Sequence, residues 1–212
     1  MSKLGEFILR KFSREPDSLD ILHPGYEKRH HDLSACMTNL EETFPNFRNT
    51  VSGLCVLDVG CAEGLETIAI ALLGAKEVCG IDIRIDVNLA KELKAKHAPD
   101  KDIKCHVMDA CRTSFHDDTF DAVVTLGSFE HFQDPYEVLK EARRITRHGG
   151  RIFITSGVWG SPWGAHMNYF AYVPWVQFLF SEDTVLKVRS IYRSDGATKY
   201  SEIEGGLNQV GV

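Results

Sequence analysis

From residue 51 to residue 156, short apolar runs typical of β-strands alternate with segments whose apolar residues recur at helical spacing. The strand-like runs cover residues 51–60, 77–83, 103–109, 120–126 and 151–156. Two parallel strands need a long crossover between them, and a helix is the usual crossover. The alternation therefore predicts an α/β fold: a doubly wound, mostly parallel sheet with right-handed connections.

The predicted helices have boundary signals of their own. Residues 63–73 follow the first strand with an apolar face at helical spacing,. Asp86 and Asp134 are placed to cap the next two helices, and Pro135 stands at a first helical position,. Gly149 and Gly150 are expected to end the helix that precedes the fifth strand. A further short helix is predicted for residues 181–189, with Ser181 as its cap.

Length and composition limit the remaining possibilities. The 212 residues suit one domain, and 43% hydrophobic with 25% charged residues is typical of a soluble globular protein,. A formal net charge of -6 leaves no basic excess for nucleic acid,. No apolar run reaches the roughly 18 residues of a membrane span, and residues 1–10 lack a signal-peptide core. The six cysteines form no CxxC pair, which favours reduced thiols and a cytoplasmic location.

We expect three segments: an N-terminal helical lid or cap (1–50), the α/β core (51–157) and an aromatic-rich acceptor or cover segment (158–212). In the first segment Leu4, Phe7, Ile8 and Phe12 form an apolar stripe among basic residues. Such a stripe either touches anionic lipids or packs on the domain or on a second subunit, and the packed alternative is preferred.

Acidic residues and glycines stand where the predicted strands end. The first strand runs into Asp58-Val59-Gly60-Cys61-Ala62-Glu63-Gly64, where the two glycines permit a tight turn and a close approach of a ligand,. Asp82 ends the second strand and is suited to accept both hydroxyls of a ribose. Asp109 ends the third strand. Because the carboxyl ends of parallel strands meet at one edge of the sheet, these acids predict a nucleoside site.

The nucleoside is not expected to belong to a dinucleotide. A pyrophosphate needs the pattern G-x-G-x-x-G, but Ala62 and Leu65 occupy the second and third glycine positions,. Glu63 also puts a negative charge where the phosphates would lie. S-adenosylmethionine has no phosphate, and its ammonium group suits an acid such as Asp58.

The sequence resembles the class I S-adenosylmethionine-dependent methyltransferases. The features that carry the resemblance are the motif VLDVGCAEG, Asp82, Asp109 and the segment FDAVVTLGSFEHFQDPYEVLKEARRITRHGGRIFIT. The resemblance covers about residues 51–156. It implies a Rossmann-like fold, S-adenosylmethionine as cofactor and a methyl-transfer reaction. The residues implied to bind the cofactor are Asp58, Gly60, Cys61, Gly64, Asp82, Ile83, Asp109, Ala110, Leu126 and Gly127.

The acceptor side is less constrained by the sequence. His131, which follows the fourth strand, is a candidate base for an acceptor hydroxyl, and Glu130 would orient it or bind substrate. His166 is a second candidate. Glu130-His131 also resembles part of the E-x-x-E-H metal motif of some O-methyltransferases, but Gly127 stands at the first acidic position. We therefore expect no metal site. In the alternative interpretation Glu130 forms a cap or salt bridge and His131 packs structurally.

The aromatic segment 159–180 is expected to line an acceptor pocket, to cover the sheet edge, or both. Its resemblance to methyltransferases of glycan pathways favours a sugar hydroxyl over other small-molecule acceptors. No pair of strands is evident after Ser156, so the domain is predicted to lack the C-terminal β-hairpin of the family. The exposed fifth strand would then need a cover, either this segment or the partner of a homodimer. Two alternatives remain: a non-catalytic module that binds S-adenosylmethionine, and, with the glycine pattern against it, an NAD(P) oxidoreductase.

Overall fold

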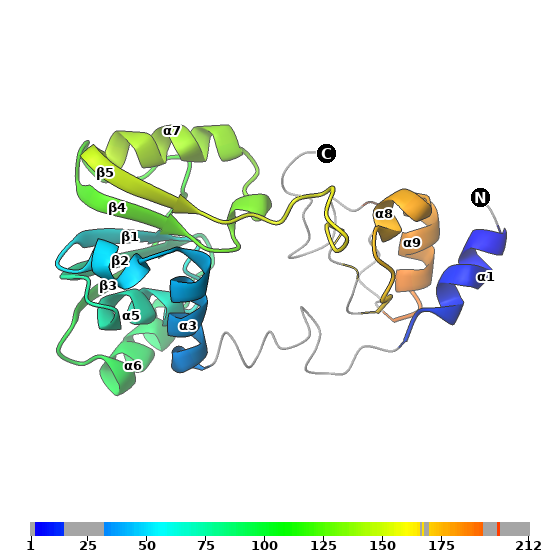
Figure 1. Cartoon of the computed structure of the whole chain (residues 1–212), viewed down its shortest axis with the longest axis horizontal. Coiled ribbons are helices and arrows are strands. Elements are labelled where there is room, and N and C mark those ends of the chain that lie inside the picture. The colour runs from blue at the N-terminus through cyan, green and yellow to red at the C-terminus, as the bar shows by residue number, and fades with distance from the viewer. Residues whose placement is uncertain (1–2, 15–31, 166, 168–169, 193–198, 200–212) are drawn as a thin grey trace. The chain divides into compact units, whose positions relative to one another are not determined.

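The structure is a computed structural model that describes residues 3–14, 32–165, 167, 170–192 and 199. Five strands form its sheet, in the order β3-β2-β1-β4-β5 (Figure 1). Their bounds are β1 Cys55–Val59, β2 Glu77–Asp82, β3 Asp102–Val107, β4 Phe120–Thr125 and β5 Thr146–Ile154. All four pairings between neighbouring strands are parallel. The predicted α/β fold class with a parallel sheet is confirmed.

Helices connect the strands as the sequence predicts. They are α5 Leu65–Leu72 after β1, α6 Val87–His97 after β2 and α7 Pro135–Ile145 after β4. The Asp86 carboxylate accepts hydrogen bonds from the backbone N–H groups of Asn88 and Leu89. Asp134 does the same for Glu137 at the start of α7. Both predicted caps are therefore confirmed, and each satisfies donors that the first helical turn leaves unpaired.

The direction of winding reverses between β1 and β4. The connection through α5 leads from β1 to β2, toward one edge, whereas α7 leads from β4 to β5, toward the other. Right-handed crossovers that run in opposite directions place their helices on opposite faces of the sheet. Two preceding helices, α3 Leu33–Thr43 and α4 Phe47–Val51, pack with α5 in the main hydrophobic cluster, to which Val56 of β1 belongs.

Two predicted boundaries are wrong. Val51 lies in α4 instead of in the first strand, which begins at Cys55. Val51 is buried in the main hydrophobic cluster, so its apolar character reflects the packing of a helix. Gly149 and Gly150 lie inside β5 instead of ending α7. The helix ends at Ile145, and the Thr146 hydroxyl donates to the Ala142 carbonyl at 2.6 Å. The extra residues are accommodated by a register shift in the pairing of β4 with β5.

The chain divides into two compact units. One comprises Lys28–Phe129 and Asp134–Ser156 and contains the sheet; we call it the α/β unit. The other comprises Met1–Glu27, Glu130–Gln133 and Gly157–Val212, and we call it the helical unit. The predicted segment 1–50 therefore has parts in both units.

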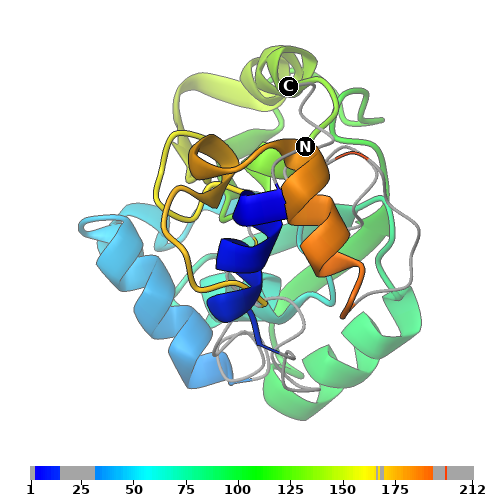
Figure 2. The same ribbon diagram turned by 90° about the vertical axis from the view of Figure 1, so that its right-hand side faces the viewer.

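Helix α1 (Lys3–Lys11) lies alongside α9 (Glu182–Arg189) in the helical unit, as Figures 1 and 2 both show. A short helix, α8 (Val176–Leu179), precedes α9, and Ser181 caps α9 by accepting from the N–H of Thr184, as predicted. Leu9 of α1 is buried with Phe170, Val185 and other apolar residues of the aromatic segment and α9. This unit therefore has a small core of its own.

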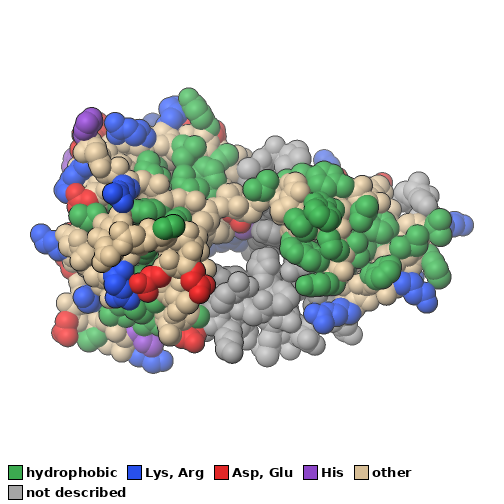
Figure 3. Space-filling model, viewed as in Figure 1, with side chains coloured by type: hydrophobic (Ala, Val, Ile, Leu, Met, Phe, Trp, Pro, Cys, Tyr) green, Lys and Arg blue, Asp and Glu red, His purple; other side chains and the backbone are tan. Residues whose placement is uncertain are grey.

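The apolar stripe of the α1 segment is exposed in the single chain, so it is not packed within the helical unit, and its predicted packing on a second subunit stays a prediction. Leu4, Phe7 and Phe12 are each at least 60% exposed, and Ile8 is 38% exposed. Figure 3 shows hydrophobic side chains gathered over the part of the chain that contains α1 and α8. No strand follows β5 in the residues that the structure describes, and none of the described helices has the length and apolarity needed to cross a membrane.

Candidate active site

A tight turn follows the central strand β1. The backbone N–H groups of Gly60 and Cys61 both donate to the carbonyl of Ile81, at 2.8 and 3.1 Å. Gly60, Ala62 and Gly64 all have left-handed backbone conformations, with φ of 79°, 46° and 88°. Glycine adopts this conformation without strain, whereas Ala62 adopts it despite its Cβ. Ala62 and Glu63 are the exposed residues of this turn, whereas Cys61 and Gly64 are buried.

The Cys61 thiol does not face outward from this turn. Cys61 is buried in a small cluster with Ala90 and Cys105. A Cβ at Gly80 would lie 2.9 Å from the Cys61 sulfur, so β2 needs glycine at this position. The Cys61 side chain is therefore not exposed to a ligand of the turn, while its backbone N–H and carbonyl form hydrogen bonds with Ile81 and Gly64.

Asp82, the last residue of β2, forms hydrogen bonds with residues that follow β1 and β3. Its Oδ2 accepts from the N–H of Ala62 at 3.1 Å, and its Oδ1 accepts from the N–H of Arg84 at 2.8 Å. Its backbone carbonyl accepts from the N–H of Met108, just after β3. A carboxylate has about four acceptor positions, so two backbone donors leave room for further hydrogen bonds. The side chain is thus fixed in place while it stays available to a ligand.

Asp58 is a buried carboxyl beneath the turn. It is 1% exposed, and its Oδ2 accepts a hydrogen bond of 2.7 Å from the Thr67 hydroxyl of α5. Burial raises the pKa of Asp58 to about 7, against the lowering effect of the Thr67 hydrogen bond, and the charge of Asp82 raises it further. A cation placed next to Asp58 would favour its ionised form.

Two residues of the first turn of α5 were missed by the sequence analysis. Thr67 is the hydrogen-bond partner of Asp58. Burial, with the nearby Asp58 charge, raises the pKa of the Glu66 carboxyl to about 8. Glu66 and Thr67 stand two and three residues after Gly64, in the first turn of the helix. The sequence signal for them is this position, because the first turn of a helix faces the preceding loop with its free N–H groups. Acidic groups are thus concentrated beneath the turn.

The turn meets the end of β4 at the point where the winding reverses. The Ser128 hydroxyl donates to the Gly60 carbonyl at 3.1 Å, and the Gly127 N–H donates to the Thr155 hydroxyl at 2.7 Å. Gly127 has a φ of 65°, and a Cβ built on it would meet no atom within 4 Å. The space beside Gly127 is therefore open, at the place where ligands of open α/β sheets bind.

The other predicted cofactor residues also lie at strand ends. Asp109 is exposed just beyond β3, where it accepts from the N–H of Cys111, and Ala110 beside it is half-buried. Ile83 is 59% exposed after β2, and Leu126 is half-buried after β4. All ten residues predicted to bind the cofactor belong to the α/β unit. Their roles toward a ligand remain predictions.

The predicted acceptor residues do not belong to the α/β unit. Glu130 and His131 belong to the helical unit, in a short helical turn, Phe129–His131. Glu130 is only 7% exposed, and its Oε2 has no hydrogen-bond partner within the described part of the chain. His166 lies outside the described residues. Within those residues no group of three or more His, Cys, Asp or Glu side chains is arranged to hold a metal ion.

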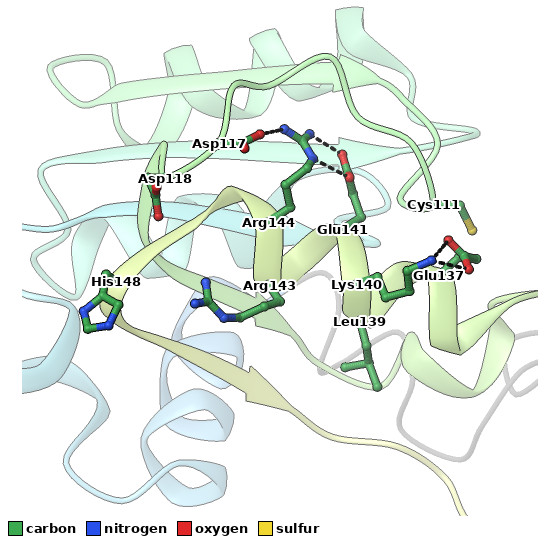
Figure 4. A pocket seen from close by; sticks show the side chains of 10 residues that line it. All are labelled: Cys111, Asp117, Asp118, Glu137, Leu139, Lys140, Glu141, Arg143, Arg144 and His148. Atoms are coloured by element: carbon green, nitrogen blue, oxygen red, sulfur yellow. Dashed lines mark hydrogen bonds and ion pairs between the residues drawn. The ribbon is translucent and has the colours of Figure 1, made fainter.

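A hollow of about 900 Å³ lies along α7, away from the strand ends (Figure 4). Five of its charged side chains bind one another: Arg144 pairs with Asp117 and Glu141, and Lys140 pairs with Glu137. The hydrogen bonds from Arg144 lower the pKa of Glu141 to about 2. Arg144 also donates to the Phe115 carbonyl, so the network ties α7 to the loop before β4. We interpret this hollow as structural, since most of its charged side chains serve this network.

The sequence matches known proteins over the same region. Residues 57–154 match a family model described as a methyltransferase domain. The chain is 30% identical over 133 residues to 27-O-demethylrifamycin SV methyltransferase of Amycolatopsis mediterranei, covering 62% of this chain and 49% of that protein. It is 29% identical over 136 residues to demethylmenaquinone methyltransferase of Bacillus subtilis, covering 63% and 58%.

A third relative is the ubiquinone biosynthesis O-methyltransferase of Hydrogenovibrio crunogenus. It is 25% identical over 166 residues, covering 77% of this chain and 64% of that protein. The chain thus spans between about half and two thirds of the length of these relatives.

Proposed function

We propose that this chain, whose residues 57–154 match a family model described as a methyltransferase domain, transfers a methyl group from S-adenosylmethionine to a hydroxyl of a small-molecule acceptor. S-adenosylmethionine supplies, when bound, an electrophilic methyl group on a positively charged sulfur. The protein's contribution to such an in-line displacement is to hold the two reactants in line and to keep water out.

The open space at the Cβ position of Gly127, with buried acid beneath the neighbouring turn, is the observation that supports this proposal most. A ligand with an ammonium group and a sulfonium but no phosphate fits this acidic surrounding. Asp58, with the backbone of Gly60, Cys61 and Gly64, would hold its methionine part. Asp82, whose carboxylate is already oriented by two N–H groups, would accept from the ribose hydroxyls,.

The adenine and the sulfonium have proposed partners as well. The exposed apolar side chain of Ile83 would pack on the face of the adenine ring, while Asp109 and Ala110 would meet its edge. Leu126 and Gly127 would lie below the sulfonium. A phosphate-bearing dinucleotide fits this set of residues poorly, because its charge would stand close to Asp58, Glu63 and Glu66.

Glu130 and His131 are the proposed acceptor-side residues, with His166 as a further candidate. An acceptor hydroxyl has to lose its proton during methylation, and His131 is the proposed base. The Oε2 of the buried Glu130, which has no hydrogen-bond partner among the described residues, supports a role in accepting a hydrogen bond from the acceptor,.

We propose a class of acceptor, a small molecule with a hydroxyl group, and within it a sugar hydroxyl. Names of relatives include an O-methyltransferase of ubiquinone biosynthesis and a methyltransferase of a rifamycin, which supports a hydroxyl on a small molecule. The aromatic segment 159–180 favours a sugar hydroxyl, because flat aromatic faces suit a sugar ring.

The six free cysteines favour a reducing, cytoplasmic location,. We propose the segment 158–212 as the acceptor cover and residues 1–50 as the cap.

Calorimetry with S-adenosylhomocysteine and with NAD, followed by methyl-transfer assays with labelled S-adenosylmethionine, tests these proposals. We expect S-adenosylhomocysteine to bind and NAD not to bind. Transfer is then measured to two panels of acceptors, free and nucleotide-linked sugars and hydroxylated quinols. Methylation of the sugars only supports the glycan proposal, whereas methylation of the quinols only refutes it while the hydroxyl proposal stands. Binding without transfer to either panel would indicate a non-catalytic module, and absence of binding would overturn the proposed function.

A further inference from the structure

The helical unit exposes an unusual amount of apolar surface on a helix that is firmly held. In α1 only Leu9 belongs to the small core, while Leu4 and Phe7, and Phe12 just after the helix, are exposed. A surface helix normally turns its apolar face inward. Here α1 is fixed by the Glu6–Lys187 ion pair to α9 and, just after it, by the hydrogen bond from the Arg14 N–H to the Phe170 carbonyl. Its outward stripe is therefore part of a defined arrangement.

The segment around α8 adds further exposed apolar residues to the same unit. Tyr172, Trp175, Phe178 and Leu179 are between 46% and 65% exposed. Trp175 is held in place by its indole N–H, which donates to the Gly160 carbonyl at 3.1 Å, and by its backbone N–H, which donates to Pro162. Aromatic side chains with one polar end are suited to the boundary between water and lipid. Hereafter "the apolar surface" means Leu4, Phe7, Ile8 and Phe12 of the α1 segment with these four residues.

The charge around α1 is opposite to that of the whole chain. The chain has a formal net charge of -6, but residues 3–14 contain the cations Lys3, Arg10, Lys11 and Arg14 and a single acid, Glu6. Glu6 is already paired with Lys187 and Arg10. The Lys11 ammonium lies 5.4 Å from the centre of the Phe7 ring, so cation and apolar group are neighbours. Apolar side chains bordered by cations are the pattern of helices that lie in the headgroup region of anionic bilayers.

A second copy of this chain fits the apolar surface less well. A twofold contact would place the same surface of each copy against the other and bring the cations of both α1 segments together. Such an arrangement is opposed by like-charge repulsion, whereas lipid phosphates would neutralise the same cations. The charge thus favours a lipid surface over a copy of the chain.

We propose that the apolar surface docks on an anionic phospholipid bilayer. Phe7, Phe12 and Phe178 enter the boundary between headgroups and acyl chains, and Lys3, Arg10 and Lys11 pair with lipid phosphates. The association is peripheral and reversible, since it depends on a few side chains and on salt-sensitive charge. It does not depend on the proposed reaction or its cofactor.

Flotation with vesicles tests this proposal without any substrate. One vesicle type is phosphatidylcholine alone, and the other adds phosphatidylglycerol at about one lipid in three, an anionic fraction that attracts basic segments. We expect the full chain to float with the anionic vesicles and to lose at least about tenfold in partition on neutral ones, as several cations together predict. Tryptophan fluorescence, to which Trp175 contributes together with Trp159 and Trp163, should shift to shorter wavelength with the anionic vesicles, because the exposed indole of Trp175 leaves water.

Variants distinguish the apolar surface from general stickiness. The double variant Phe7→Ser/Phe12→Ser should reduce partition about tenfold or more, and Lys3→Gln/Lys11→Gln about tenfold. Tyr136→Ser is the matched control, since Tyr136 is an equally exposed aromatic residue (68%) of α7 in the α/β unit. The helix content of each variant by circular dichroism verifies its folding.

Three results would overturn the proposal: the wild-type chain stays with the unbound fraction, Tyr136→Ser loses as much partition as the Phe7/Phe12 variant, or sedimentation reveals a dimer that Phe7→Ser/Phe12→Ser dissociates. Because no cofactor enters the assay, each of these results leaves the methyl-transfer proposal to its own test.

Discussion

Replacing Asp58 by asparagine should make the cofactor-free protein more stable at alkaline pH while weakening its proposed ligand binding. Asp58 is 1% exposed, and burial raises its pKa from an ordinary 3.8 to about 7. The folded state therefore binds this proton more tightly than the unfolded state. Its stabilising effect is present below the unfolded pKa and is lost as the pH rises through the folded pKa. Above about pH 7 the wild-type protein keeps an ionised carboxylate in a buried position.

The magnitude follows from the two pKa values. A difference of about three pKa units, at about 1.4 kcal/mol each, corresponds to about 4 kcal/mol of unfolding free energy lost between acid and alkaline pH. The amide oxygen of the introduced asparagine would still accept the Thr67 hydrogen bond, but its buried NH₂ group costs about 1–2 kcal/mol if it lacks partners. We therefore expect Asp58→Asn to stabilise the protein by about 2–3 kcal/mol at about pH 8, to leave it nearly unchanged at about pH 5 and to destabilise it by about 1 kcal/mol at about pH 4.

Urea unfolding followed by far-ultraviolet circular dichroism is the appropriate assay. The three tryptophans, Trp159, Trp163 and Trp175, all belong to the helical unit, so their fluorescence does not report on the α/β unit. Asp100→Asn is the control, because Asp100 is an exposed residue of the same unit as Asp58. Glu66, whose pKa is also raised, to about 8, should retain part of the pH dependence in the variant.

The decisive observation is the change of sign between acid and alkaline pH. A variant that is less stable than the wild type at every pH, with an unchanged slope of stability against pH, would show that Asp58 is not a strained carboxylate. The same purified variant should bind S-adenosylhomocysteine at least about tenfold more weakly, as expected for a lost charge-assisted hydrogen bond. Undiminished binding would refute its proposed contact with the ammonium group.

Three further substitutions test the site and its support. Asp82→Ala should weaken S-adenosylhomocysteine binding by about 1–3 kcal/mol in calorimetry, because it removes the proposed ribose acceptor; unchanged affinity would contradict that role. Gly80→Ala should cost about 2–4 kcal/mol in urea unfolding, because the new Cβ would lie 2.7 Å from the Thr67 hydroxyl and 2.9 Å from the Cys61 sulfur, whereas Gly160→Ala, with open space, should be neutral,. His131→Ala should lower turnover about a hundredfold with unchanged cofactor affinity, and a matching loss of affinity would instead indicate a structural role.

Much of the fold is predictable because its periodicity and its caps agree. The structure confirms the helix starts predicted from Asp86, Asp134 and Ser181. Each of these side chains can accept a hydrogen bond, and each directly precedes a segment with apolar residues at helical spacing, which is the sequence signal of a helix N-terminus. The start of β5 was not predictable in this way. Gly149-Gly150 has the composition of a helix stop, but the strand begins earlier because Thr146 both ends α7 and pairs with Phe120 of β4. Pairing across the sheet, which is non-local, decided that boundary.

The orientation of α1 shows a second limit of sequence reasoning. Leu4, Phe7, Ile8 and Phe12 share one helical face, and that face predicts burial if a partner surface is available. The structure instead buries Leu9 with Phe170 and Val185, and in this rotation Glu6 pairs with Lys187 of α9. An ion pair between residues 181 positions apart is invisible to local periodicity. For the same reason the sequence revealed Asp58 and the glycine turn, but not the Thr67 hydroxyl that binds Asp58 from the next helix.

Asp58 and Glu66, the acids beneath the turn, should release protons when the proposed ligand binds. At about pH 7 Asp58 is near its pKa of about 7, and Glu66, with a pKa of about 8, is mostly protonated. A ligand ammonium bound beside them would favour the ionised forms, so S-adenosylhomocysteine binding should release up to about one proton. Its binding enthalpy should then vary with the ionisation enthalpy of the buffer, whereas adenosine, which has no ammonium group, should show no such variation. Equal buffer dependence for both ligands would mean that the acids serve the fold alone.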